Sequence, residues 1–128
     1  MTALARRAGM RVLGPNCMGT MNPAIGFIGT FTSTIAEAPR PGAISIASQS
    51  GAFAAHCLVL LRDRGVGVDL WAAVGNQADV QVGDCIGYMA ASASTTVIVA
   101  CVEGIADAPG FLRALAFARD AGKLVVLM

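Results

Sequence analysis

Apolar residues gather in four continuous runs separated by stretches of helical spacing. The runs cover residues 43–47, 68–74 and 96–102, and a last one starts at Leu124. Continuous apolar runs, unlike alternating ones, are typical of parallel strands that helices cover on both faces. The pattern predicts an α/β fold: an open, doubly wound parallel sheet whose strands are joined by right-handed crossovers.

Three stretches between these runs carry apolar residues on one helical face. Residues 51–64 and 80–91 show this spacing, and Gly65 offers a left-handed stop after the first of them. The third helix is expected to begin with Asp107 as its N-cap and to end at Gly122. Strands and helices therefore alternate through residue 128.

The first 42 residues follow a different pattern. Residues 2–8 predict a short helix and residues 11–13 a brief strand, after which Gly and Pro punctuate the sequence through residue 42. We interpret residues 14–42 as a connector that reaches in from a neighbouring domain. One hydrophobic core is expected for a chain of 128 residues.

Composition narrows the possible partners. The 128 residues are 55% apolar and 13% charged, with a formal net charge of +1. The low charged fraction predicts elements buried on both faces or a surface that meets another domain. The net charge of +1 supplies no positive field, which argues against nucleic-acid and membrane partners. No apolar run approaches the ~20 residues that span a bilayer, and no secretory signal is visible, so we expect a cytoplasmic protein.

Cysteine spacing gives no sign of a metal site. The four cysteines form no C-x-x-C pair and there is a single histidine, so no metal is expected. We interpret the cysteines as reduced cytosolic thiols. They are Cys17, Cys57, Cys85 and Cys101.

Polar residues follow the predicted strands at the edge where ligands bind in open parallel sheets. Four loops are predicted to form one site. They contain Ser48, Gln49, Ser50 and Gly51; Gly75 to Asp79; Glu103 and Gly104; and Gly14 to Cys17, which follows the brief leading strand.

The segment from Ser48 to Gly51 opens a helix. Its uncapped N–H groups, its hydroxyls and the positive end of the helix dipole are suited to a phosphate, whereas the alternative is simple N-capping by Ser48 or Ser50. Glu103 follows an apolar run, where an imidazole or cation would relieve its desolvation; the alternative is that it points into water.

The remaining polar candidates are less specific. Asn76 and Asp79 are expected either to cap the second helix or to contact a ligand. His56 lies inside the first helix rather than in a strand-end loop, so we interpret it as structural or merely exposed. Cys17 has no adjacent acid or imidazole that would make it a nucleophile.

Several motifs in order resemble the NDP-forming acyl-CoA synthetases, relatives of the succinyl-CoA synthetase α subunit. The resemblance covers nearly the whole chain, which makes it far more specific than any one motif. The motifs are Gly14-Pro15-Asn16-Cys17-Met18-Gly19, Asn22-Pro23, Pro41-Gly42, Ser48-Gln49-Ser50-Gly51-Ala52, Gly75-Asn76-Gln77-Ala78-Asp79-Val80 and Glu103-Gly104-Ile105.

The resemblance implies a flavodoxin-like CoA-ligase domain at residues 43–128, preceded by residues 1–13 as the end of a Rossmann CoA-binding domain. The family converts acyl-CoA, phosphate and NDP to acid, CoA and NTP, reversibly, through a phosphohistidine. The resemblance implies that the Ser48–Gly51 helix start cradles the phosphohistidine and that Glu103 contacts its imidazole. It also implies that Asn16 and Cys17 lie near the acyl group and CoA thiol.

The same resemblance implies CoA, ADP or GDP, and Mg as ligands of the complete enzyme, none bound tightly by this chain. CoA-binding and ATP-grasp domains or subunits are the implied partners. In the family the phosphohistidine follows the fourth strand, beyond Met128, and His56 does not match it. We therefore expect the isolated chain to be inactive.

Two other functions stay open at this point. One is a non-catalytic CoA- or nucleotide-sensing module, such as the ligase-like part of a protein acetyltransferase. The other is a flavodoxin, in which Ser48 to Gly51 hold an FMN phosphate, although only Trp71 and Tyr88 are present to stack on a flavin. The acyl group and the choice of ADP or GDP do not follow from the sequence.

Overall fold

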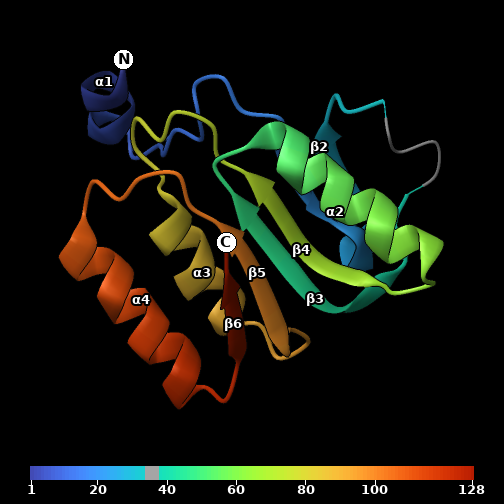
Figure 1. Ribbon diagram of the computed structural model, residues 1–128. Coiled ribbons are helices and arrows are strands. Elements are labelled where there is room, and N and C mark those ends of the chain that lie inside the picture. Colours follow the sequence, from blue (N-terminus) through green and yellow to red (C-terminus); the bar gives the residue numbers. More distant parts are fainter. Residues whose placement is uncertain (34–37) are drawn as a thin grey trace.

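The computed structural model describes residues 1–33 and 38–128, and all of the predicted helices form (Figure 1). The predicted strands 43–47, 68–74 and 96–102 and the one beginning at Leu124 form as well, with ends close to those predicted. The elements are α1 (Thr2–Arg7), β1 (Gly19–Asn22), the 3-10 helix η1 (Pro23–Ile25), β2 (Phe27–Thr30), β3 (Pro41–Ser48), α2 (Gly51–Asp63), β4 (Val68–Ala73), α3 (Val82–Ala90), β5 (Val97–Cys101), α4 (Ala108–Asp120) and β6 (Leu124–Leu127).

The six strands form one sheet in the order β2-β1-β4-β3-β5-β6. Strand β3 is central and runs parallel to β4 and β5, and β5 runs parallel to β6. This confirms the open α/β sheet, with one addition at the edge. There, β1 pairs antiparallel with both β4 and β2, so the sheet is mixed rather than wholly parallel.

The β1–β2 hairpin corrects the prediction for residues 14–42. That segment is not simply an irregular connector, because Met21 is 2% exposed and pairs in register with Trp71 of β4. The strand predicted at residues 11–13 is also wrong, since the backbone there is not paired as a sheet strand. Residues 34–37 of the expected connector lie outside the described residues.

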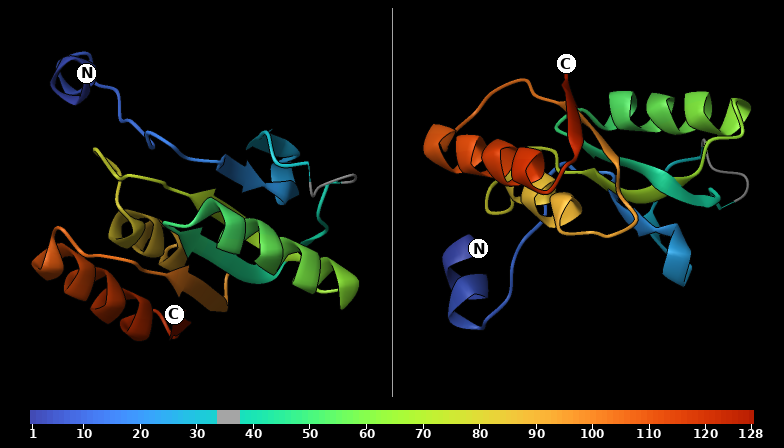
Figure 2. Two further views of the ribbon diagram at one scale, coloured as in Figure 1. Left: turned by 45° about the horizontal axis from the view of Figure 1, so that its top comes forward. Right: turned by 90° about the horizontal axis from the view of Figure 1, so that it is seen from below.

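Helices cover both faces of the sheet, as predicted. Helix α2 lies on one face, and α3 and α4 lie together on the other (Figure 2). On the α2 face, Ala54 and Leu58 pack against Ile46 and Trp71, and the indole Nε1 donates to the Ala54 carbonyl at 3.0 Å. The larger core lies on the other face and contains Leu70, Ala72, Val82, Ile86, Met89, Ile98, Ala100 and Phe111.

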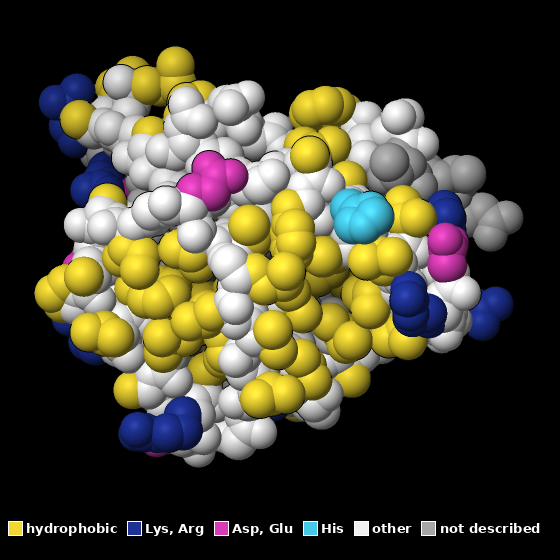
Figure 3. All heavy atoms as spheres, viewed as in Figure 1, with side chains coloured by type: hydrophobic (Ala, Val, Ile, Leu, Met, Phe, Trp, Pro, Cys, Tyr) yellow, Lys and Arg dark blue, Asp and Glu magenta, His cyan; other side chains and the backbone are white. Residues whose placement is uncertain are grey.

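Part of the α2 face is uncovered over the last two strands. Val126 pairs in register with Val99, which packs against the α2-side core, yet Val126 is 40% exposed and the nearby Leu124 is 61% exposed. Figure 3 shows apolar side chains gathered on this face. The high apolar content of the chain thus comes partly from open sheet surface. No helix among the described residues is long and apolar enough to cross a membrane.

A buried polar cluster joins the strands at the amino end of the sheet, opposite the candidate site. The hydroxyls of Ser45 and Thr95 are 2.7 Å apart, and Thr95 donates to the Asp69 carboxylate at 2.6 Å. Lys123 Nζ donates to the Thr95 carbonyl at 2.6 Å. These contacts link β3, β4 and β5 far from the strand-end loops.

Candidate functional site

The structure brings the predicted strand-end loops together at one edge of the sheet. The loops after β3 and β5 are joined through the Gln49 side chain, which reaches the backbone of Gly104. The loop after β4 contacts the turn at residues 14–17, because Asn16 Nδ2 donates to Asn76 Oδ1 at 3.2 Å. The predicted site residues thus form two pairs of neighbouring loops.

The start of α2 leaves two backbone donors unpaired. Ser50 is the N-cap: its Oγ accepts the Phe53 N–H at 3.2 Å, and its carbonyl accepts the Ala54 N–H at 3.1 Å. Within the described part of the chain, the N–H groups of Gly51 and Ala52 have no acceptor. Two orphan donors at the positive end of a helix dipole can bind an anion.

Neighbouring residues fix this helix start. Ser48 is buried and its hydroxyl donates to the Ser50 carbonyl at 2.7 Å, which orients the cap. The Met18 side chain lies so close to Gly51 that a Cβ there would be 2.6 Å from the Met18 sulfur. The N-capping alternative for Ser50 is therefore confirmed, and it leaves the first-turn N–H groups available.

Gln49 does not point over the helix start. Its side-chain Oε1 accepts from the N–H groups of Glu103 and Gly104, the latter at 2.9 Å, and its Nε2 donates to the Gly104 carbonyl at 2.5 Å. Its own N–H donates to the Cys101 carbonyl at 3.1 Å. Gln49 is buried, so the phosphate contact predicted for this side chain is not one that its placement favours.

Glu103 presents its carboxylate at the end of β5. The residue is exposed, and its carboxylate has no hydrogen bond or ion pair with any described residue. Its backbone, in contrast, is held by Gln49. Glu103 therefore has a backbone held by Gln49 and an unpaired carboxylate.

Asp79, the other predicted carboxylate of the site, is fully engaged. It accepts from Arg6 at 2.6 Å, from Arg11 Nε at 2.9 Å and from the Val12 N–H at 2.9 Å, and its side chain is buried. The hydrogen bond from Arg11, followed by those from Val12 and Arg6, holds the pKa of Asp79 well below its ordinary value, and Asp79 in turn raises the pKa of Arg11. Asp79 ties the chain's first residues to the loop after β4.

Backbone contacts extend this tie. Asn76 N–H donates to the Pro15 carbonyl at 2.9 Å, and Ala78 N–H donates to the Gly14 carbonyl at 2.8 Å. Gly75 has φ +60°, and a Cβ there would lie 2.3 Å from the Asn16 carbonyl oxygen. Residues 12–16 thus lie along the loop after β4, where the sequence predicted only a shared edge.

Asn16 and Cys17 occupy the turn that caps this loop. Asn16 is exposed and has a left-handed φ of 54°, and Cys17 Sγ donates to the Leu13 carbonyl at 3.5 Å. Burial raises the pKa of the Cys57 thiol and raises that of Cys85 to about 12, which makes these two thiols poor nucleophiles. All four cysteines are free.

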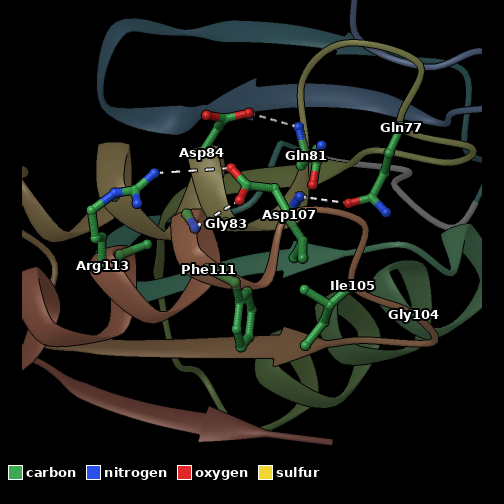
Figure 4. Close-up of a pocket in the computed structure, with 13 residues that line it drawn as sticks. Gln77, Gln81, Gly83, Asp84, Gly104, Ile105, Asp107, Phe111 and Arg113 are labelled. Carbon is green, nitrogen blue, oxygen red and sulfur yellow. Dashed lines mark hydrogen bonds and ion pairs between the residues drawn. The ribbon is translucent and has the colours of Figure 1, made fainter.

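A cavity of about 320 Å³ lies between the starts of α3 and α4, beside Gly104 (Figure 4). Two of its polar side chains cap helix N–H groups. Gln77 Oε1 accepts the Val82 N–H at 2.7 Å, and Asp107 accepts the Gly110 N–H at 2.9 Å, which confirms Asp107 as N-cap. Neither Asn76 nor Asp79 caps α3, because Gln81 is its N-cap.

The structure adds residues that sequence analysis missed. Arg6 and Arg11 engage Asp79, and Met18 covers Gly51. The only sequence signal for the contact with the two arginines was the position of Asp79, an acidic residue in the loop that begins at Gly75. His56 is exposed on α2. No group of His, Cys, Asp and Glu in residues 1–33 and 38–128 has the arrangement of a metal site.

Residues 41–128 match the family model described as the succinyl-CoA ligase like flavodoxin domain. An ADP-forming acetate–CoA ligase I from Archaeoglobus fulgidus is 37% identical over 110 residues, covering 86% of this chain and 16% of that protein. A trans-feruloyl-CoA synthase from an unknown prokaryotic organism is 35% identical over 130 residues, covering 100% of this chain and 18% of that protein.

A solved structure shows the same fold. The dinucleotide forming acetyl-coenzyme A synthetase 1 of Ca. Korarchaeum cryptofilum, in complex with phosphate and ADP, matches with a TM-score of 0.84 and 28% sequence identity. The match covers 98% of this chain and 27% of that one. The chain therefore spans less than a third of each of these relatives.

Proposed function

Since the chain belongs to the family of the succinyl-CoA ligase like flavodoxin domain, we propose that it is the phosphate-handling part of an NDP-forming acyl-CoA synthetase. The complete enzyme would interconvert acyl-CoA, phosphate and NDP with acid, CoA and NTP through a phosphohistidine. The names of the two sequence relatives, an acetate–CoA ligase and a feruloyl-CoA synthase, support a thioester-forming ligase and differ in the acyl group.

The observation that carries the proposal is the start of α2. Gly51 and Ala52 offer unpaired N–H groups. The Ser50 hydroxyl accepts the Phe53 N–H through its oxygen, so its own proton is still available to donate to a ligand. Together with the helix dipole, these donors would hold a phosphoryl group without a cationic side chain. Ser48 would keep the cap in place through its bond to the Ser50 carbonyl.

Glu103 would act on the histidine that carries the phosphoryl group, which another part of the complete enzyme would contribute. Its unpaired carboxylate would accept a hydrogen bond from the imidazole and stabilise the positive charge that develops during transfer. The acyl group and CoA thiol would approach the turn at Asn16 and Cys17. Asn76, hydrogen-bonded to Asn16, would position that turn.

The remaining ligands would be held by other parts of the enzyme. CoA would be bound by a CoA-binding domain, and the nucleotide, with Mg, by an ATP-grasp domain or subunit. The described residues supply phosphate donors and one free carboxylate, but no set of metal ligands. Because its single histidine, His56, lies within α2 and not at the helix start, the chain by itself should remain unlabelled by radioactive ATP.

Phosphorylation of the complete enzyme tests this function. Incubated with γ-labelled ATP, the enzyme should gain acid-labile phosphate on a histidine other than His56. Adding CoA and the carboxylic acid substrate should then release this phosphate. Labelling of His56, or none in an enzyme that turns over, contradicts the proposal. A complete protein that binds CoA yet neither turns over nor labels would instead be the sensing module.

Inorganic phosphate tests the cradle in the chain itself. The amide resonances of Gly51 and Ala52 should shift on titration. The Gly110 amide at the start of α4 is the matched control, because Asp107 already accepts its hydrogen bond. Equal shifts at both helix starts would indicate non-specific binding.

A further inference from the structure

We propose that Gln49 is a positioning residue that fixes Glu103 relative to the anion-binding start of α2. The inference rests on the proposed function, because it assigns a role between two groups of that site. Gln49 has no direct contact with the reacting atoms in this role. It acts by joining the two loops that carry the unpaired N–H groups and the unpaired carboxylate.

The geometry of the Gln49 amide is that of an added peptide group. It accepts from two successive N–H groups, at Glu103 and Gly104, and donates to the Gly104 carbonyl. The Gln49 N–H also donates to the Cys101 carbonyl at 3.1 Å. Pairing between β3 and β5 therefore continues past the last paired residues, Ser48 and Cys101, through a side chain.

This arrangement matters because no other hydrogen bond holds Glu103 in the part of the chain that the structure describes. Its carboxylate makes no bond with any described residue, and the residue is exposed in a loop. Without the amide, the loop after β5 loses its fixed distance to Ser50 and Gly51. A carboxylate that orients an imidazole must be held within a fraction of an ångström of its working position, and supporting hydrogen bonds provide this.

Only an amide side chain fits all of these bonds. A carboxylate at position 49 still accepts from the two N–H groups but cannot donate to the Gly104 carbonyl. A methionine has similar length and makes none of the bonds. The series Gln49, Gln49→Glu and Gln49→Met therefore removes the link in two steps at nearly constant side-chain size.

The test measures phosphohistidine formation in single turnover, together with CoA affinity, in the complete enzyme. Gln49→Met should slow phosphorylation by about 10- to 100-fold, the usual effect of losing an orienting partner, with CoA affinity unchanged. Gln49→Glu should lie between Gln49→Met and the wild type. The matched control is Ser45→Ala, which removes a buried bond between β3 and the Thr95 segment at the opposite end of the sheet and should leave the rate unchanged.

Amide hydrogen exchange in this chain gives a second readout. In Gln49→Met, the Glu103 and Gly104 amides should exchange faster while amides in the middle of α2 do not change. If Gln49→Met fails to fold, the phosphorylation rate of Gln49→Glu decides the matter, because that variant keeps the acceptor of both N–H groups and loses only the bond to the Gly104 carbonyl.

Three outcomes overturn the inference. They are wild-type phosphorylation in both Gln49 variants, unchanged exchange at Glu103 and Gly104 in Gln49→Met, or an equal slowing in Ser45→Ala. A wild-type enzyme that forms no phosphohistidine defeats the proposed function instead, so the two failures are distinguishable.

Discussion

The loops after β4 and β3 end at the same edge of the sheet but use their polar groups in opposite ways. In the loop after β4, the Asp79 carboxylate is satisfied by Arg6, Arg11 and Val12. In the loop after β3, the N–H groups of Gly51 and Ala52 have no acceptor in the described chain.

This difference separates a scaffold from a site. A buried carboxylate surrounded by donors has no capacity left for a ligand, although it can hold a segment of chain in place. Orphan donors and an unpaired carboxylate retain that capacity. By this criterion, we propose that the loops after β3 and β5 form the reactive half of the edge and that the loop after β4 forms its support.

Glu103→Gln should produce the largest change, in the reactive half. The substitution keeps the shape and removes the negative charge that would support the imidazole, so turnover of the complete enzyme should fall by about 10²- to 10³-fold. Phosphohistidine formation and CoA affinity are the measurements, and CoA affinity should hardly change. Phosphorylation at the normal rate would leave Glu103 as a strand-end residue only.

Asp79→Asn should have its effect in the supporting half. The amide cannot pair with both guanidinium groups, so the segment through Arg11 should detach from the loop. Trypsin should then cut at Arg6 and Arg11 faster than in the wild type. Asp84→Asn is the matched control, because Asp84 also lies 3.8 Å from Arg11 but is half exposed. Equal cleavage in both variants contradicts the role given to Asp79.

Acid should weaken the same contact. Because the pKa of folded Asp79 lies below that of the unfolded chain, its contribution to stability is present at neutral pH and is lost as pH falls below about 4. The free energy of unfolding should therefore drop more steeply with acid in the wild type than in Asp79→Asn. Parallel pH profiles for the two proteins count against the pairing.

Gly75→Ala should separate residues 12–16 from the loop after β4. The left-handed backbone and the contact with the Asn16 carbonyl together should cost about 1–3 kcal/mol in the free energy of unfolding. Gly87→Ala is the control, since a Cβ there meets open space inside α3 and should stabilise the protein by about 0.5–1 kcal/mol. Chemical denaturation compares them, and similar values for the two would exclude a tight approach at Gly75.

Ser50→Ala should have the smallest effect. Loss of the N-cap costs about 1 kcal/mol of stability. Phosphate should bind only slightly more weakly, because the Gly51 and Ala52 N–H groups remain. A complete loss of the phosphate-induced shifts at these amides would mean that the hydroxyl, rather than the backbone, binds the anion.

The parallel strands and their helices were predictable because their signals are local. The runs that became β4 and β5 are apolar on both faces, and Asp107 marks the start of α4 by a contact three residues away. The β1–β2 hairpin was not predictable in this way. Its sequence is rich in turn residues, and Met21 becomes a strand residue by packing beside Trp71.

The same division holds for the candidate site. The strand-end rule by itself predicts that Ser50 and Glu103 lie at one edge. The hydrogen bonds that distinguish Gln49 and Asp79 from the other polar residues of this edge join Gln49 to Glu103 and Asp79 to Arg6. Both pairs are far apart in sequence. No local pattern encodes such pairs, so the roles of Gln49 and Asp79 required the structure.

The contact of Asp79 with Arg6 and Arg11 has a consequence for protein engineering. A chimaera joined at Gly14, the start of the expected connector, would leave Asp79 with neither guanidinium group and a buried negative charge. A splice point before Arg6 keeps donor and acceptor on the same parental segment. Chimaeric libraries built on this sheet should therefore place the junction on the amino-terminal side of α1.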